Sequence, residues 1–368
     1  MIPYGRQTIS TRDIKAMTDV FKTGWITQGP AISAFEQKVA RYIGARHAAV
    51  VANGTAALHI AYLAAGIGKG DEVITTPNTF AATTNMLLAI GAKPVFCDIR
   101  MDTYNIDEKQ IEKYVTKKTK AIVPVHFSGH PCEMNAIWRV ARRHKLFVIE
   151  DGAQALGAKY RGKCIGSGGS DMVTYSFHPV KAITTGEGGM VVTNDTRLYE
   201  RLLLFRNHGI TKDAKGFNVM THLGYNYRMT DLQAALGASQ MDRLKEFLQK
   251  RHEAVGWYKA EFGKFDKVIL PRELPGVYSG WHLYVIRVKQ QKDRLPLYRH
   301  LQQSGIGVNF HFPNVYRHPY YQKRGFAKIH LANADLYHET AITLPLFPLL
   351  TRRDVRFICK AVRNYFSA

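Results

Sequence analysis

Residues 147–155 read Phe-Val-Ile-Glu-Asp-Gly-Ala-Gln-Ala. The apolar start of this stretch predicts a buried strand, and the charged Asp151 follows directly at its end. Ligands of open α/β sheets bind beyond the carboxyl ends of the strands. We therefore expect Asp151, together with Gln154 on the turn that follows, to face a ligand. A helix cap is the alternative role for Asp151, because aspartate is a common capping residue.

Similar apolar runs, with helical patterns between them, lie on both sides of this stretch. We expect strands at residues 48–51, 72–75, 94–97, 121–125, 172–175 and 190–192, and helices at 55–65 and 80–90. Continuous apolar strands are typical of a parallel sheet that is buried on both faces. The predicted class for this part of the chain is α/β.

The sequence changes in character after a long helical pattern, which starts with Thr230 as its N-cap and continues towards Tyr258. Beyond it we expect a strand, a helix and an extended segment at 281–286, 297–303 and 308–311. A chain of 368 residues is too long for one ordinary core. We predict a large domain over residues 1–245 and a smaller α+β domain over residues 246–368.

The chain is strongly basic, with 51 Lys and Arg against 29 Asp and Glu and a net charge of +22. Such a field attracts nucleic acids, anionic membranes or anionic metabolites. The basic residues are dispersed, and we interpret the charge as a surface property that favours a substrate such as a nucleotide diphosphate. We expect neither a nucleic-acid nor a membrane partner. A nucleic-acid-binding regulator is the rival function, but no nucleic-acid-binding motif supports it.

We expect no metal site, disulfide framework or secretory leader. The four cysteines are widely spaced without a C-x-x-C pair. His126, His130, His178 and His311 lack the H-x-x-x-H spacing of a helical metal site. We find no apolar segment of membrane length and no leader, so a cytoplasmic protein is expected.

Two further segments carry chemistry beside Asp151. Residues 53–58 read Asn-Gly-Thr-Ala-Ala-Leu between a strand and a helix, where free backbone N–H groups and a hydroxyl form an anion site. An ordinary helix cap is the alternative. Lys181 lies between a strand and a glycine-rich stretch at 186–189, which lets backbone approach a ligand closely. An aspartate is the usual partner of the pyridinium nitrogen of pyridoxal phosphate.

In combination these segments resemble the sugar aminotransferases of the DegT/DnrJ/EryC1/StrS family, within the fold-type-I pyridoxal-phosphate enzymes. The resemblance extends over essentially the whole chain and includes residues 2–7, 26–30, 176–181, 224–230, 281–284 and 319–321. It is closest to the UDP-4-amino-4,6-dideoxy-N-acetyl-altrosamine transaminases of pseudaminic acid biosynthesis. The resemblance implies a large domain with a mainly parallel sheet and a smaller C-terminal domain.

The resemblance also implies roles around the cofactor. Lys181 would form the Schiff base with pyridoxal phosphate and move a proton between the cofactor and C4 of the sugar. Asp151 would keep the pyridine nitrogen protonated, Gln154 would bond the ring oxygen, and Phe80 would stack on the ring.

Further residues would bind the phosphate and the sugar nucleotide. Thr55, Ala56 and Ser176 would hold the phosphate with Asn226 of a second subunit, which implies a homodimer with shared sites. The sugar-nucleotide pocket would be lined by Tyr4, Gly24, Trp25, Ile26, Thr27, His311, Phe312, Pro313 and Asn314.

The implied reaction moves an amino group from L-glutamate to C4 of a UDP-linked 4-keto-6-deoxy-N-acetylhexosamine, with the pyridoxamine form of the cofactor in between. Another nucleotide-linked keto-sugar is the alternative substrate. Residues 311–316 read His-Phe-Pro-Asn-Val-Tyr where the subgroup commonly has His-Tyr-Ile-Pro-Val-His, and Ala182 replaces a common proline. A dehydratase of the same fold would have histidine at the position of Lys181, so the lysine argues against it.

Overall fold

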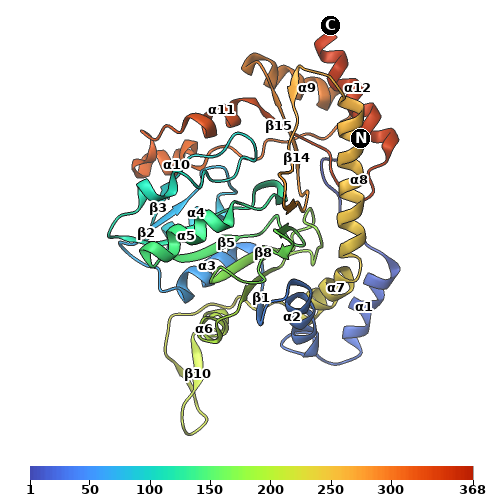
Figure 1. Ribbon diagram of the computed structural model, residues 1–368. Helices are drawn as coiled ribbons and strands as arrows, with labels where there is room; N and C mark the ends of the chain where they lie inside the picture. Colours follow the sequence, from blue (N-terminus) through green and yellow to red (C-terminus); the bar gives the residue numbers. More distant parts are fainter. Residues whose placement is uncertain (368) are drawn as a thin grey trace.

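The computed structural model describes residues 1–367. Its largest sheet contains β1 (His47–Val51), β2 (Glu72–Thr75), β3 (Lys93–Phe96), β4 (Thr119–Val123), β5 (Phe147–Asp151), β8 (Met172–Ser176) and β9 (Gly189–Thr193). The seven strands have the order β1-β9-β8-β5-β4-β2-β3 (Figure 1). The strands β3, β2, β4, β5 and β8 are parallel, whereas β9 is antiparallel to both of its neighbours. The predicted α/β class with a mainly parallel sheet is confirmed.

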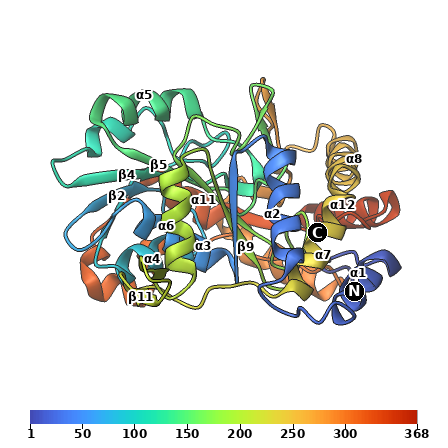
Figure 2. The ribbon, with the colours of Figure 1, turned by 90° about the horizontal axis from the view of Figure 1, so that it is seen from below.

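Helices cover both faces of this sheet, because successive residues of a strand point to opposite sides. Val148 of β5 packs into the apolar layer on one face and Ile149 into the layer on the other. The layer of Val148 includes α2 (Pro30–Ile43), α5 (Met134–His144) and α7 (Asp231–Met241). The layer of Ile149 includes α3 (Gly54–Ala64), α4 (Ala82–Ala89) and α6 (Thr196–Arg206). Figure 2 shows α2 and α6 on either side of β9. Burial on both faces explains the continuous apolar runs.

The helix predicted to run from Thr230 towards Tyr258 is two helices. Thr230 does cap α7, in a capping box with Gln233. The prediction of one continuous helix is wrong, because α7 ends at Met241 and α8 (Leu244–Phe262) begins after Arg243. Arg243 leaves the helical conformation with ψ of 2°, and its guanidinium binds Asp13 and the carbonyl oxygen of Thr8. Contacts with the start of the chain therefore accompany the break.

A second hydrophobic core lies beside α8. It is built on an antiparallel sheet of β12 (Val268–Ile269), β14 (Tyr284–Val288) and β15 (Ala341–Leu344), covered by α9 (Arg294–Gln303) and α12 (Arg352–Ser367). The strand predicted at 281–286 begins only at Tyr284, since Trp281 has a left-handed φ of 40°. Residues 308–311 contribute a single bridge, between Asn309 and Thr343, instead of a strand.

The start of the chain joins this second core. The backbone of Ile2 donates to Gly305 at 2.9 Å and accepts from Gly307 at 2.7 Å, and the carbonyl oxygen of Tyr4 accepts from Leu346 at 3.0 Å. The backbone of residues 2–4 thus pairs with this second core and not with the sheet that residues 47–51 begin. The division of the chain at residue 245 stays a prediction.

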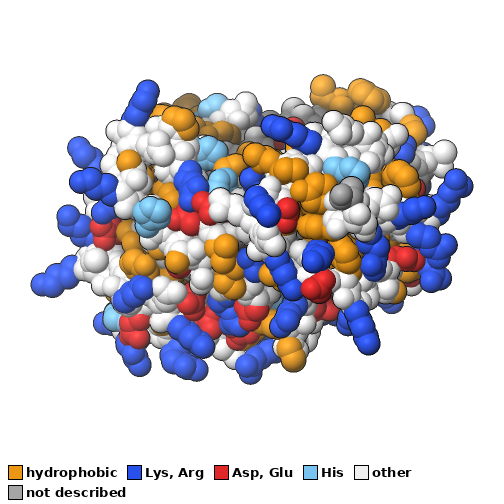
Figure 3. All heavy atoms as spheres, turned by 90° about the horizontal axis from the view of Figure 1, so that it is seen from above, with side chains coloured by type: hydrophobic (Ala, Val, Ile, Leu, Met, Phe, Trp, Pro, Cys, Tyr) orange, Lys and Arg blue, Asp and Glu red, His pale blue; other side chains and the backbone are white. Residues whose placement is uncertain are grey.

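A hairpin of β10 (Ile210–Lys212) and β11 (Asn218–Met220) projects from the body of the molecule (Figure 1). The smaller elements are α1 (Thr11–Phe21), β6 (Lys159–Tyr160), β7 (Lys163–Cys164), β13 (Val277–Tyr278), α10 (Pro319–Tyr321) and α11 (Ala332–Thr340). Lysine and arginine side chains are scattered over the face shown in Figure 3 and form no single stripe there. Within residues 1–367 no helix combines the length and apolar character needed to cross a membrane.

Candidate active site

A cavity of about 480 Å³ lies at the carboxyl ends of β1, β4, β5 and β8. This is where open α/β sheets bind their ligands. The cavity brings together nine of the residues that the sequence predicted, namely Tyr4, Thr55, Phe80, Asp151, Gln154, Ser176, Lys181, His311 and Phe312. Segments that are far apart in the chain therefore meet at one site.

Asp151 is fixed at the end of β5 by two hydrogen bonds. The Thr83 hydroxyl donates to Oδ2 at 2.7 Å, and the backbone N–H of Ala153 donates to Oδ1 at 3.1 Å. Thr83 in turn lies 2.7 Å from the hydroxyl of Thr79. Each carboxylate oxygen keeps a further lone pair. The buried carboxylate can therefore accept a hydrogen bond from a protonated ring nitrogen.

Lys181 is held on the loop between β8 and β9, where its backbone N–H donates to the carbonyl oxygen of His178 at 2.9 Å. Burial lowers the pKa of its amine to about 8; the charge of Asp151 opposes this and the guanidinium of Arg251 adds to it. A lysine acts as a nucleophile or base only when it is neutral. A lowered pKa therefore makes this amine suitable for Schiff-base chemistry near neutral pH.

The start of α3 and the end of β8 form the anion-binding side of the cavity. Gly54 lets the two approach, since an added Cβ would lie 2.9 Å from Cβ of Ser176. Asn53 is also the N-cap, because its Oδ1 accepts from the backbone N–H of Ala56 at 2.8 Å. The N–H of Ala56 is therefore already engaged, whereas Thr55 and Ser176 line the cavity itself. A helix start with a nearby hydroxyl suits a phosphate.

Two residues suit the ring of a cofactor. Gln154 accepts from the backbone N–H of Ser128 at 2.7 Å through Oε1, which leaves its amide group as a donor for a ring oxygen. Phe80 is exposed at the cavity, with its ring centroid 6.0 Å from that of Phe312. The lysine, carboxylate, amide donor, aromatic ring and anion site together fit pyridoxal phosphate.

Two histidines of the cavity are uncharged near neutral pH. Burial lowers the pKa of His311 to about 4, with the Lys181 charge adding to the effect. Burial also holds the pKa of His282 well below its ordinary range. His311 lies 2.9 Å from the hydroxyl of Thr343, through Nδ1. Both rings therefore offer hydrogen-bonding groups to a ligand, not positive charge.

Other predicted residues lie outside this cavity. Asn314 is completely buried, and its amide donates to Tyr316 and Asp335 at 3.1 Å each. Pro313 precedes it and does not line the cavity. The remaining residues lie on other parts of the surface and are Gly24, Trp25, Ile26, Thr27 and Asn226.

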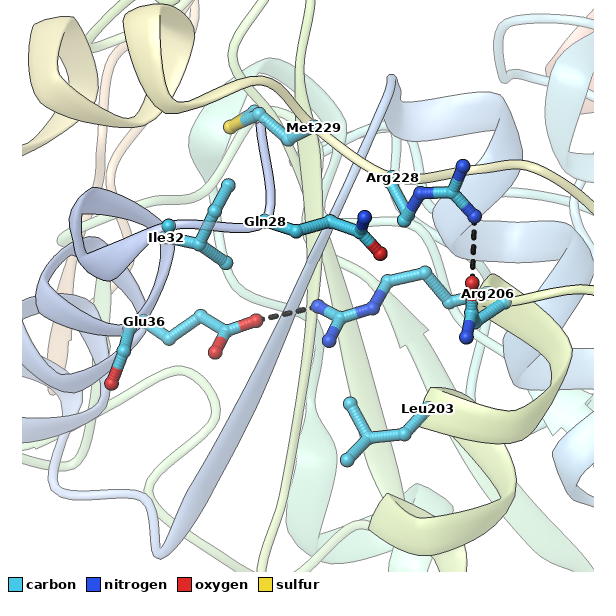
Figure 4. A pocket seen from close by; sticks show the side chains of 10 residues that line it. Gln28, Ile32, Glu36, Leu203, Arg206, Arg228 and Met229 are labelled. Atoms are coloured by element: carbon cyan, nitrogen blue, oxygen red, sulfur yellow. Dashed lines mark hydrogen bonds and ion pairs between the residues drawn. The ribbon is translucent and has the colours of Figure 1, made fainter. Parts of the chain in front are cut away.

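A second pocket of about 300 Å³ lies beside these outlying residues (Figure 4). It is formed by α2, α6 and the segments around Gln28 and Arg228. In it Arg206 donates to Glu36 at 2.6 Å, and Arg228 donates to Asn207 at 2.6 Å (Figure 4). The sequence reasoning assigned no function to this pocket, although residue 228 lies within the segment 224–230 that carried the resemblance.

Four residues with charged or hydrogen-bonding side chains are among those that sequence reasoning missed at the main site. Glu187 and His282 line the cavity, Thr83 lines it and binds Asp151, and Arg251 lies behind it. The spacing of residues in the sequence could have indicated two of them, Thr83 and Arg251. Thr83 follows Phe80 by one helical turn, and Arg251 continues the spacing of Leu244 and Leu248 along an apolar helix face.

Comparisons with known proteins agree with this geometry. The chain is 40% identical over 376 residues to the Bacillus subtilis spore coat polysaccharide biosynthesis protein SpsC, covering 99% of this chain and 96% of SpsC. It is similar to the structure of Helicobacter pylori PseC, an aminotransferase involved in the biosynthesis of pseudoaminic acid. The TM-score is 0.95, with 33% identity over 100% of this chain and 99% of PseC.

The putative sugar aminotransferase Spr1654 from Streptococcus pneumoniae, in its PMP-form, is also similar. Its TM-score is 0.95, with 28% identity over 100% of this chain and 99% of Spr1654. The DegT/DnrJ/EryC1/StrS aminotransferase family matches residues 7–363. The cavity and these matches agree, and the chain belongs to the DegT/DnrJ/EryC1/StrS family as a sugar aminotransferase that uses pyridoxal phosphate and its pyridoxamine form.

Proposed function

We propose that this aminotransferase moves an amino group from L-glutamate to C4 of a UDP-linked 4-keto-6-deoxy-N-acetylhexosamine, as a step towards pseudaminic acid. The observation that carries this proposal is the whole-chain likeness to PseC at 33% identity and a TM-score of 0.95. The net charge of +22 also favours a substrate that carries a diphosphate. The proposal places the reaction in the cytoplasm, as expected from the sequence.

In this proposal Lys181 moves the proton at the reacting carbon. When bound, the cofactor withdraws electrons from the carbon that carries the amino group. The neutral amine of Lys181 acts as a positioned base, and it would move the proton between the cofactor and C4 of the sugar. Asp151 keeps the ring nitrogen protonated, and the two hydrogen bonds to its carboxylate hold it in place.

We also propose a homodimer in which Asn226 of one subunit reaches the phosphate in the cavity of the other. Asn226 is exposed and outside its own cavity. The nearby hairpin exposes 66% of Phe217, 69% of Met220 and 72% of Leu223. We call these three side chains the hairpin surface. Apolar side chains exposed together mark a protein interface, and a second copy is the commonest partner.

A keto-sugar of a different surface polysaccharide is the second candidate substrate. The 40% identity to SpsC, which is named for spore coat polysaccharide biosynthesis, favours it. Residues 311–316 also depart from the text common in the pseudaminic acid subgroup. Both candidates share the catalytic residues and differ only in the acceptor.

Absorption spectroscopy of the purified protein tests both candidates. We expect the visible band of the bound cofactor to bleach on addition of L-glutamate and to return with a UDP-linked 4-keto-6-deoxy-N-acetylhexosamine. Parallel additions of other nucleotide-linked 4-keto sugars compare the acceptors. If the band returns only with one of those other sugars, that sugar replaces the proposed substrate. No bleaching with glutamate would contradict the proposed donor.

A further inference from the structure

Arg251 of α8 is a buried arginine without a carboxylate partner in the described part of the chain. Only 2% of the residue is exposed. Its Nη1 donates to the carbonyl oxygens of Trp281 and His282 at 3.2 Å and of Leu346 at 3.1 Å, and its Nη2 donates to that of Val180 at 3.5 Å. Burying a charge that no opposite charge balances costs free energy. A core of apolar residues would avoid this cost, so the charge itself calls for an explanation.

The partners of Arg251 place its charge directly behind the active-site cavity. Val180 is the residue before Lys181, and His282 lines the cavity. The guanidinium therefore joins the Lys181 loop and the segment before β14 to the long helix α8. Burial lowers the pKa of Arg251 to about 10, so the group stays charged at neutral pH.

We propose that Arg251 is a positioning residue that fixes the Lys181 loop to α8 and places a positive charge behind the Lys181 amine. This inference rests on the proposed role of Lys181 as nucleophile and base. A nearby cation disfavours a second positive charge. The Asp151 carboxylate acts in the opposite direction on the same amine, so Arg251 offsets part of the effect of the carboxylate that the cofactor requires.

Other titratable groups surround Lys181 and contribute to the pH dependence of its amine. They are Asp151 at the end of β5, His178 on the lysine loop, His282 before β14, His311 near Thr343, and Glu187, which faces His178. Burial keeps the pKa of each of the three histidines below its ordinary value. Near neutral pH, Arg251 is therefore the main fixed positive charge beside the amine.

The test measures Lys181 itself in the cofactor-free, full-length protein. The rate at which acetic anhydride acetylates Lys181 is followed from pH 6 to pH 10 by peptide mass spectrometry, in the wild type and in Arg251→Met, Arg251→Gln and Arg251→Lys. We expect the rate at pH 7 to fall about fivefold to tenfold in the Met and Gln variants, because the neutral fraction falls tenfold for each unit by which a pKa rises. Arg251→Lys keeps the charge and should stay near the wild-type rate.

Arg287→Met is the matched control. Arg287 is also buried and donates to uncharged groups, the hydroxyls of Tyr104 at 3.1 Å and Thr340 at 3.4 Å, but neither of these partners lines the cavity. We expect its removal to leave the acetylation rate of Lys181 unchanged. The measurement needs neither glutamate nor a sugar, so its outcome is independent of the spectroscopic test of the proposed function.

Two outcomes overturn the proposal. One is an unchanged rate at Lys181 in a folded Arg251→Gln protein, whose amide still donates to carbonyl groups. The other is failure of both the Met and Gln variants to fold while Arg287→Met folds, which assigns Arg251 to stability alone.

Discussion

The Lys181 cavity and the hairpin surface are two opposite kinds of site in one molecule. The residues that line the cavity come from distant segments of one chain, and its Asp151 carboxylate already accepts two hydrogen bonds. The hairpin surface is exposed, and the nearby Asn226 is exposed too and does not line the Lys181 cavity of its own chain. Residues drawn from one set of family motifs therefore lie in two different places. Under the proposed homodimer, most serve the cavity of their own chain and Asn226 serves that of the second copy.

The largest expected effect falls on the cavity. Lys181→Ala should lower kcat by at least about 10²–10⁴-fold, since a positioned general base supplies that much rate. Single-turnover and steady-state assays with glutamate and a keto-sugar acceptor measure it. Multiple turnover close to the wild-type rate would show that another group moves the proton.

The next effect distinguishes the two sites directly. Asn226→Ala should lower activity about tenfold to a hundredfold, because a hydrogen bond to a charged phosphate is worth about 1.5–3 kcal/mol. Subunits of Asn226→Ala refolded with subunits of Lys181→Ala should recover about a quarter of the wild-type activity, since a mixed dimer holds one intact site. If each mutation affects its own chain's cavity, the mixture will recover nothing.

A smaller effect concerns stability and pH. The folded pKa of Lys181, about 8, lies below the ordinary 10.5, so the unfolded chain binds the proton more readily. The amine therefore destabilises the cofactor-free fold fully below pH 8, and this cost is lost as the pH rises towards 10.5. Lys181→Met should be more stable than the wild type by about 1–3 kcal/mol at pH 7. Urea denaturation at pH 7 and pH 10 checks that the difference shrinks at the higher pH.

The smallest effect concerns the support of Asp151. Thr83→Val keeps the shape of the side chain and removes the hydroxyl that donates to the carboxylate at 2.7 Å. We expect kcat to fall about threefold to tenfold, because Thr83 acts on the reaction only through Asp151 and only part of the roughly 1.5–3 kcal/mol of a hydrogen bond to a charged group is lost in the transition state. Thr84→Val is the control, because Thr84 binds Tyr321 and not Asp151. Equal losses in both variants would indicate a general packing effect.

The large sheet was predictable because its strands are buried on both faces and read as apolar runs in the sequence. Asp151 and Lys181 were predictable for a related reason, since each follows such a strand. The second core was harder to predict from the sequence, because its strands are short. One of them also begins later than its apolar run, since Trp281 has a left-handed backbone conformation. The break before α8 accompanies contacts between Arg243 and Asp13, which sequence periodicity cannot reveal.

The site could be predicted only in part for similar physical reasons. Thr83 and Arg251 bind partners on other elements, so the spacing of each within its own helix gave no sign of those partners. Asn314 follows the segment that lines the cavity, yet its amide belongs to a buried network with Asp335. Adjacent positions in a loop can therefore face a ligand or the interior, and their order in the sequence does not decide between them.

The pairing of residue 2 with residues 305–307 has a consequence for synthesis on the ribosome. The chain emerges at about 5–20 residues per second, so the first residues are made roughly 15–60 s before their partners. The sheet from β1 to β9 can form during that interval, because all of its strands lie within residues 47–193. The second core must wait for β15 and for both ends of the chain, so its assembly is a late event of translation.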